Sequence, residues 1–205
     1  MASETKLYLY PLWLRIWHGI NALGIIILIV TGISMQYSGN NFVLIGFSAA
    51  VSLHNISGLV VTAGYLIFFL GNILTSNGKY YHFKTKGMMD DLMKQSHYYL
   101  SGMFKKQETP FPVTSKRKFN PLQKVSYLVI MYLVVPLVIV SGIALLFPEF
   151  IIDRIYRFSG IMLTAMVHSI AGFIVSLFLC IHIYVASIGK SPLNNFKSMV
   201  SGWHS

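Results

Sequence analysis

Long apolar stretches separated by polar connections dominate the hydrophobic pattern of this chain. Four stretches are predominantly apolar: residues 12–35, 49–74, 125–147 and 160–188. A helix needs about 20 predominantly apolar residues to cross the hydrocarbon core of a bilayer. The pattern therefore predicts an all-α membrane protein, in which residues 1–205 form a single domain built on a four-helix transmembrane bundle.

The connection between the second and third stretches, residues 75–120, is too long to be a simple turn. Apolar side chains in its centre, residues 88–104, recur at close to helical spacing. This spacing predicts a short amphipathic helix on the inner membrane surface. Pro136 lies inside the third stretch and is expected to kink that helix, because proline lacks the backbone N–H of the helical ladder.

Charged residues are scarce and unevenly distributed. Only 11% of the 205 residues are charged, against roughly a quarter in soluble domains. The net charge of +10 could suggest nucleic acid, but 14 of the 16 basic residues fall on one side of a four-span topology. Only Arg154 and Arg157 fall on the other side. This positive-inside pattern predicts cytoplasmic N- and C-termini and a cytoplasmic long loop, and it argues against a nucleic-acid partner.

Four histidines lie inside the predicted spans, where an ionisable side chain is costly and marks a candidate functional site. His54 and His168 each begin the pattern His-x-x-x-Gly, and the glycine one turn later leaves room for a bulky flat group. Both lie slightly inside the outer ends of their spans. His18 and His182 lie near the inner ends of theirs and form a second pair at matched depth.

The fourth span must then serve both pairs. His168 and His182 are 14 residues apart, which corresponds to roughly 21 Å of rise and nearly four full turns. Their side chains therefore face almost the same way, one near each membrane surface. This arrangement predicts two stacked haems inside the bundle, each held by two imidazoles. Such ligation leaves no open iron position and suits electron transfer.

Cysteine usage limits how a haem could be attached. Cys180 is the only cysteine, and the sequence contains no C-x-x-C-H motif, so both haems are expected to be held without covalent bonds. The remaining histidines, His82, His97 and His204, lie in the long loop or the tail and are expected to be ordinary interfacial residues.

Several short motifs occur in a specific order along the chain. They are Arg15-Ile-Trp-His18, Thr31-Gly32, Leu53-His54 through Gly58, Lys118-Phe119-Asn120-Pro-Leu-Gln123-Lys124, His168 through Gly172, and Ile181-His182-Ile-Tyr184. In this order the chain resembles the dihaem cytochrome b subunits of respiratory complexes. These are the formate dehydrogenase gamma, thiosulfate reductase and nickel-hydrogenase cytochrome b group, related to bacterial cytochrome b561.

The resemblance implies two b haems, with His18 and His182 at the inner one and His54 and His168 at the outer one. It also implies a pocket for menaquinone or ubiquinone near the inner haem, to which Asn120 would contribute.

Two residues near this pocket have competing interpretations, and a third is a weaker candidate. Asn120 is followed by Pro121, so it could equally be a helix cap. Gln123, one turn later, is the weaker pocket candidate. Arg15 lies three residues before His18 and could pair with a haem propionate or anchor the helix at lipid headgroups.

These observations lead to the interpretation of a multi-pass electron-transfer subunit in the bacterial inner membrane. It would link the quinone pool to an iron–sulfur or multihaem redox subunit on the outer face, and would carry no catalytic residue of its own. One alternative is a stand-alone oxidase that passes electrons from superoxide or another small reductant to quinone. A second alternative is a haem-free carrier or proton channel that uses the histidines as a relay. The spans contain few other polar residues that could connect the two histidine depths, which argues against it.

Overall fold

Four long helices form the body of the protein in a computed structural model that describes residues 7–39, 44–82, 86–188 and 191–204. They are α1 (Leu12–Gln36), α2 (Phe47–Leu74), the composite helix Pro121–Leu146, and α6 (Gly160–Ser187). Each is long and apolar enough to span a membrane, and each lies over one of the predicted apolar stretches. The described part of the chain is thus all-α apart from one short strand pair that joins its two ends and another between α5 and α6.

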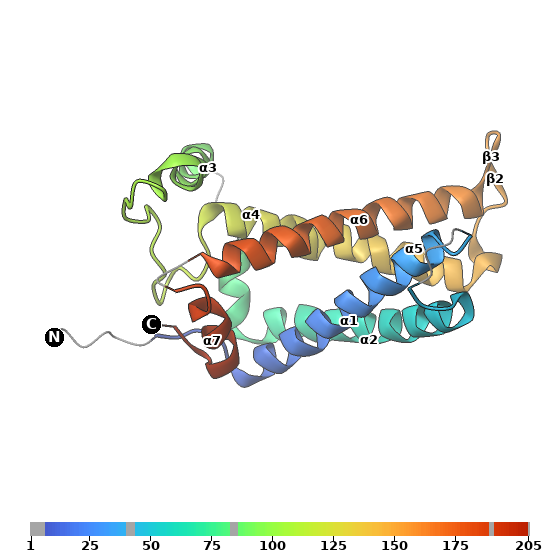
Figure 1. The fold of residues 1–205 in the computed structure, drawn as a ribbon, viewed down its shortest axis with the longest axis horizontal. Helices are drawn as coiled ribbons and strands as arrows, with labels where there is room; N and C mark the ends of the chain where they lie inside the picture. The colour runs from blue at the N-terminus through green and yellow to red at the C-terminus, as the bar shows by residue number, and fades with distance from the viewer. Residues whose placement is uncertain (1–6, 40–43, 83–85, 189–190, 205) are drawn as a thin grey trace.

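The four helices form two antiparallel hairpins that lie side by side (Figure 1). α1 packs extensively on α2, and the composite helix packs extensively on α6. Contacts between the two hairpins are far fewer, such as those between α2 and α5 (Val135–Leu146). The fold therefore consists of two tightly packed pairs that face each other along their length.

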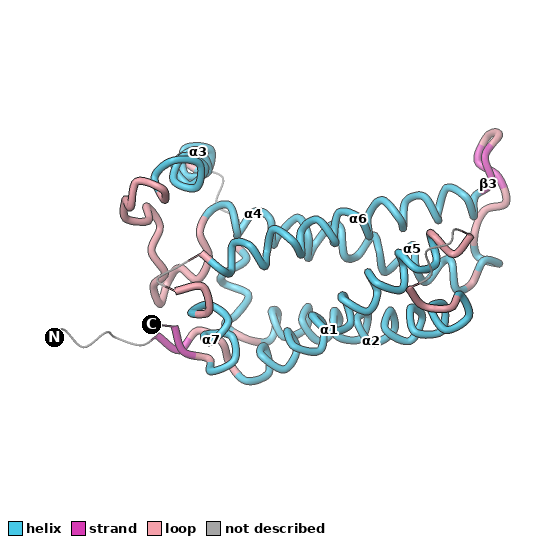
Figure 2. Tube along the Cα trace, viewed as in Figure 1, coloured by secondary structure: helices cyan, strands magenta, loops and turns pink. Residues whose placement is uncertain are grey.

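The two ends of the bundle differ in structure (Figure 2). One end carries α3 (Met88–His97), α7 (Asn194–Ser201) and a strand pair between β1 (Leu7–Tyr8) and β4 (Trp203–His204). We call this the basic end, because most lysines and arginines lie there. The other, which we call the distal end, carries a short hairpin of β2 (Arg154–Ile155) and β3 (Phe158–Ser159).

Small side chains let α1 and α2 approach closely. The indole nitrogen of Trp17 donates a 2.7 Å hydrogen bond to the Gly64 carbonyl, and the Trp17 ring stacks on Phe68 at 4.5 Å between centroids. A Cβ atom on Gly64 would lie 2.6 Å from the Asn21 amide nitrogen. Glycines at such contacts are a common basis of helix packing in membranes, where the hydrophobic effect does not drive helices together.

The composite third helix changes its winding where its sequence contains proline. It comprises α4 (Pro121–Val129), a π-helical segment η3 (Ile130–Val134) and α5. Pro136 lies one residue into α5, and its ring would clash with the carbonyl four residues earlier in a regular α-helix. The wider π-helical turn directly before Pro136 relieves this clash, so the expected irregularity occurs as a local change of helix type.

Two 3₁₀ helices and α3 occupy the connections. η1 (Ser76–Tyr81) follows α2, and η4 (Pro148–Phe150) follows α5. α3 continues into a π-helical turn, η2 (Tyr98–Gly102), so a helix does lie within residues 88–104. Met89, Met93 and Leu100 are exposed there, as expected for a helix that rests on a lipid surface.

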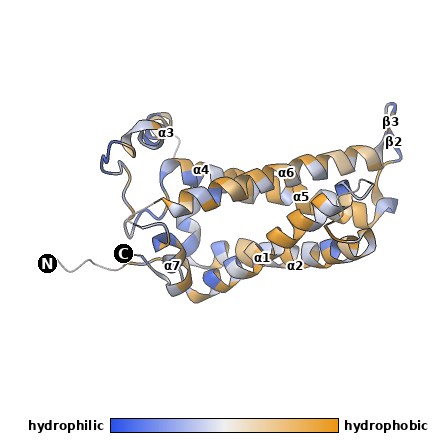
Figure 3. Cartoon of the chain, viewed as in Figure 1, coloured by the Kyte–Doolittle hydropathy of each residue, from blue (hydrophilic) through white to orange (hydrophobic). Residues whose placement is uncertain are grey.

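The apolar surface of the bundle faces outwards. Figure 3 shows hydrophobic colouring along most of the long helices and hydrophilic colouring at α3 and the β2–β3 tip. Several side chains buried inside are instead small and polar, such as Thr31, Ser34, Ser57 and Ser141. This distribution is typical of a protein whose solvent is hydrocarbon, where polar groups must be satisfied internally.

The close α1–α2 contact gives a first prediction. Replacing Gly64 with alanine should lower the free energy of unfolding by about 1–3 kcal/mol, because the new methyl group overlaps Asn21. Unfolding in a detergent titration measures this effect. The control is Gly19→Ala, where nothing lies within 4 Å of the added atom and the helix should be unaffected or slightly stabilised. Equal stability of both variants would show that the α1–α2 contact does not depend on close approach at Gly64.

Candidate functional site

The four membrane histidines lie in two cross-hairpin pairs. His18 on α1 faces His182 on α6, with 6.2 Å between ring centroids. His54 on α2 faces His168 on α6, with 6.1 Å between ring centroids. All four side chains are half-buried. The structure thus brings together the residues that the sequence pairs by depth, with α6 contributing to both pairs.

The spacing within each pair suits a metal ion between the two rings. An imidazole nitrogen lies about 2.0–2.1 Å from a bound metal and roughly 1 Å from its own ring centre, so two rings on one ion have centres about 6 Å apart. Both observed separations match this value. Nothing lies within 4 Å of a Cβ built on Gly172, one turn from His168, so a flat group has access to the backbone there.

A hydroxyl group orients the ring of His54. The Thr31 hydroxyl donates a 2.7 Å hydrogen bond to the Ile27 carbonyl, and its oxygen lies 2.9 Å from Nδ1 of His54. With its proton committed to Ile27, the hydroxyl oxygen accepts from Nδ1–H, an assignment that follows from the hydrogen-bond pattern. The lone pair of His54 is then on Nε2, the nitrogen left for a metal.

The same arrangement recurs at His168. The Ser141 hydroxyl donates a 2.6 Å hydrogen bond to the Leu137 carbonyl, and its oxygen lies 3.1 Å from Nδ1 of His168. The Val138 carbonyl is also 3.1 Å from this nitrogen and can only accept a hydrogen bond. Nδ1 therefore carries the proton in the second ring too, and Nε2 is again the free ligand atom.

Sequence reasoning did not assign these two hydroxyl groups, although a signal for them is present. A hydroxyl residue followed by glycine occurs as Thr31-Gly32 in α1 and again as Ser141-Gly142 in α5 of the second hairpin. A Cβ atom on Gly32 would lie 3.7 Å from the His54 ring, and one on Gly142 would lie 3.0 Å from the His168 ring. The hydroxyl holds the imidazole, and the glycine beside it leaves space for the ring.

The pair at the basic end has aromatic neighbours instead. The Tyr127 hydroxyl lies 3.4 Å from Nδ1 of His182, and the Phe178 ring stacks on His182 at 5.7 Å. The indole of Trp17 lies edge-on to His18 at 6.5 Å. Aromatic rings thus pack around this pair from both hairpins, whereas hydroxyl and carbonyl groups contact the other pair.

Asn120 and Gln123 form a reciprocal cap at the start of α4. Oδ1 of Asn120 accepts from the Gln123 backbone N–H at 2.9 Å, and Oε1 of Gln123 accepts from the Asn120 backbone N–H at 3.1 Å. The helix-cap interpretation of Asn120 is therefore confirmed. Nδ2 of Asn120 also donates to the Tyr99 hydroxyl at 2.7 Å, and burial raises the pKa of this tyrosine. Within the described residues, Nδ2 of Asn120 donates only to Tyr99, so its second amide hydrogen is open to a ligand.

Arg15 has a contact that its sequence position does not suggest. Its guanidinium donates to the Val200 carbonyl of α7 and so joins the start of α1 to the C-terminal helix. Its Nε atom is buried and, among the described residues, has no hydrogen-bond partner. An acidic substituent such as a propionate could satisfy that donor, so the residues present fit a haem at this end.

Comparison with known proteins identifies the family. The family model of the prokaryotic cytochrome b561 (nickel-hydrogenase cytochrome b type) matches residues 9–202. The Escherichia coli (strain K12) protein named "Putative cytochrome YdhU" is 36% identical over 203 residues, which cover 97% of this chain and 75% of that protein. The chain belongs to the prokaryotic cytochrome b561 family.

Membership in the cytochrome b561 family agrees with the four apolar helices and means haem-based electron transfer within a membrane. The family binds haem b, and its members are often subunits of redox complexes. In the described part of the chain, no three histidine, cysteine or acidic side chains converge as they would around a single metal ion. Each histidine pair instead offers two facing imidazoles, which could hold one haem from both sides.

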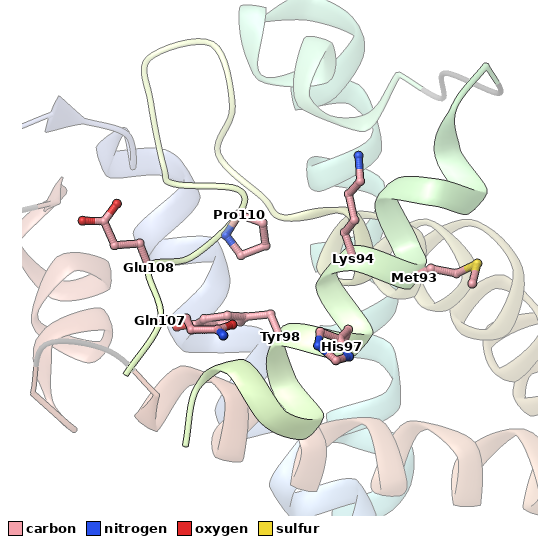
Figure 4. Close-up of a pocket in the computed structure, with 7 residues that line it drawn as sticks. All are labelled: Met93, Lys94, His97, Tyr98, Gln107, Glu108 and Pro110. Carbon is pink, nitrogen blue, oxygen red and sulfur yellow. The ribbon is translucent and has the colours of Figure 1, made fainter. Parts of the chain in front are cut away.

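The other histidines of this cytochrome lie elsewhere. His82 is exposed after η1, and His204 lies 3.5 Å from the Ser198 hydroxyl of α7. His97 lines an open hollow of about 500 Å³ between α3 and the following loop, together with Lys94 and Glu108 (Figure 4). None of the predicted haem or quinone residues lines this hollow.

The cap at Asn120 gives a second prediction. Asn120→Ala should lower the free energy of unfolding by about 1 kcal/mol, because the helix loses a side-chain acceptor at its first turn. Asn120→Asp should retain most of the stability, since aspartate caps equally well. Chemical unfolding of the two variants in detergent measures the difference, and equal losses would contradict a role for the Oδ1 cap.

Proposed function

We propose that this cytochrome is a membrane electron-transfer subunit with two bis-histidine b haems, linking the quinone pool to a partner redox subunit. The observation that supports it is the occurrence of two histidine pairs, each at the ring separation of a metal-bridged pair and each sharing α6. In this proposal His18 and His182 hold the haem of the basic end. His54 and His168 hold the haem of the distal end.

The residues around each pair suggest what the protein does for the haem. When bound, haem b supplies a centre that takes and releases one electron at a time. Thr31 and Ser141 keep the distal imidazoles in one tautomer and orientation, which favours ligation over rotation of the rings. If both imidazoles of a pair held the iron, no position would be open for oxygen, and this favours electron transfer over the stand-alone oxidase alternative.

The distribution of basic residues supports an orientation. The basic end carries the long loop and most lysines, so we place it and both termini at the cytoplasmic side of the bacterial inner membrane. The distal end would then face the outer side. There, Tyr156 at the β2–β3 tip is 97% exposed and Phe150 is 81% exposed, and we infer that an iron–sulfur or multihaem partner docks near these side chains.

We place a quinone pocket at the basic end, at the start of α4, where Asn120 and Tyr99 lie. Asn120 keeps a free amide hydrogen beside the Tyr99 hydroxyl, and both can hydrogen-bond a quinone carbonyl. Gln123 shapes this site through its cap on Asn120 and is the weaker contact. The quinone, menaquinone or ubiquinone, takes up or releases two electrons and two protons there, and the chain itself needs no substrate chemistry.

Histidine replacement tests the haem assignment. His168→Ala should leave one b haem per chain, that of the basic end, because only the distal pair has lost a ligand. His182→Ala should also leave one b haem per chain, in this case the haem of the distal end. Pyridine haemochrome quantification per polypeptide, with a reduced-minus-oxidised spectrum, measures both. His97→Ala serves as the control and should keep two haems. Two haems in His168→Ala, or none in the wild-type chain, would refute the proposal.

The quinone pocket requires a separate test with a variant that preserves the helix cap. Asn120→Asp keeps the cap but removes the amide donor, so quinol-to-haem electron transfer should slow about tenfold, the value of one hydrogen bond of ~1.4 kcal/mol. Stopped-flow reduction of the basic-end haem by a quinol analogue measures this rate. Unchanged kinetics with both haems bound would remove Asn120 from the pocket and leave the haem assignment intact.

A further inference from the structure

One lysine at the basic end is buried, in contrast to the exposed lysines around it. Lys118 directly precedes Phe119 and the α4 cap, and only 4% of its surface is exposed. Its Nζ atom lies 3.4 Å from Oδ1 of Asn77, a long and weak hydrogen bond. A lysine is almost never fully buried without a charged partner, because desolvation of the ammonium is costly.

Aromatic rings surround this amine. Nζ of Lys118 lies 4.4 Å from the centre of the Tyr10 ring, 5.5 Å from that of Tyr80 and 5.6 Å from that of Phe119. These faces attract a cation, but they do not neutralise it. Within the described residues, no carboxylate forms an ion pair with Lys118.

Two tyrosines at this site stay neutral near neutral pH. Burial raises the pKa values of Tyr10 and Tyr81, so both remain neutral. Lys79 lies 5.0 Å from the centre of the Tyr80 ring and is exposed. Burial lowers the pKa of Lys118 itself to about 7. Of Tyr10, Tyr81 and Lys118, only the lysine therefore has a pKa close to neutral pH.

A row of rings connects Lys118 to the basic-end histidine pair. The Phe119 ring lies 4.9 Å from that of Tyr127, and the Tyr127 ring lies 5.9 Å from that of His182. Asn77, the polar partner of Lys118, donates a 2.7 Å hydrogen bond from Nδ2 to Oδ1 of Asn72. Nδ2 of Asn72 in turn donates to the Tyr132 hydroxyl at 3.2 Å. The medium between the amine and the histidine is thus mostly aromatic, which leaves an electrostatic interaction weakly screened.

We propose that Lys118 is a redox-linked proton-binding site of the basic-end haem, taking up a proton when this haem is reduced and releasing it on oxidation. The inference rests on the proposed ligation by His18 and His182. It assigns Lys118 an electrostatic role through space, distinct from the contacts of Asn120 with quinone. The proton comes from water at the basic end, and the electron comes from the quinol or partner redox subunit already named.

The sign of the coupling follows from the charges. An added electron makes the haem more negative and so favours the ammonium form of Lys118. By reciprocity, the ammonium favours the reduced haem and raises its midpoint potential. The potential should therefore be high below pH 7, where Lys118 is charged, fall as pH rises through about 7, and level off where the amine is neutral. The distal haem should show this dependence much more weakly.

Two opposite replacements separate this role from a structural one. Lys118→Arg keeps the charge at all accessible pH values and should hold the basic-end haem at the high potential of the acidic limit. Lys118→Met removes the charge and should hold it at the low potential of the alkaline limit. A merely structural change would shift both variants in one direction. Potentiometric titration of the two-haem protein between pH 5.5 and 9, monitored optically, measures these curves. Lys116→Met, an exposed lysine two residues away, is the matched control and should follow the wild type.

The outcomes distinguish this inference from the function on which it rests. If the wild type binds two haems and both Lys118 variants keep its pH dependence, another group such as a haem propionate is responsible and the inference is overturned. If both variants shift the potential in the same direction, it is overturned as well. If the chain lacks the basic-end haem, the proposed ligation fails and the inference fails with it. Opposite, pH-independent limits in the two variants support it.

Discussion

The structure depends on the requirement that every polar group within the hydrocarbon find its partner inside the protein. Thr31 and Ser141 show how this works, because each hydroxyl donates to a carbonyl of its own helix and accepts from a histidine of the facing helix. Each hydroxyl therefore has both a hydrogen-bond acceptor and a donor, and each histidine keeps one ring nitrogen, Nε2, without a hydrogen bond to these groups. The hydrogen-bond requirement of the membrane thus selects the atom that can bind a metal.

This pattern is repeated in the two hairpins and is confined to the distal end. In the first hairpin the Thr31 hydroxyl hydrogen-bonds the His54 ring, and Gly32 lies beside that ring. In the second hairpin Ser141 and Gly142 make the same contacts with His168. Each hairpin therefore presents one oriented imidazole to the other. Direct contacts between the hairpins are few. A flat prosthetic group ligated from both sides would therefore join the two halves, and haem binding and bundle stability would depend on each other.

Much of this architecture could be predicted from the sequence, because the signals are periodic or repeated. Hydropathy located the four helices, and the fourteen-residue spacing put His168 and His182 on one face of α6. Depth alone gave the pairing that the structure brings within about 6 Å. The π-helical turn before Pro136 and the contact of Arg15 with Val200 could not be predicted in this way, because they depend on how the helix relieves a clash and where the tail folds back.

Lys118 was even harder to identify, since in sequence it is one member of a basic run that resembles a topology signal. Only the fold shows that this lysine turns inwards among Tyr10, Tyr80 and Phe119 while Lys116 stays outside. The contrast between the two ends then has a physical meaning. At the distal end the hydroxyls hold the histidines fixed and no buried amine is present among the described residues, which suits electrons alone. At the basic end a buried amine is connected to His182 through the rings of Phe119 and Tyr127, and this is the end where quinone chemistry would require protons as well as electrons.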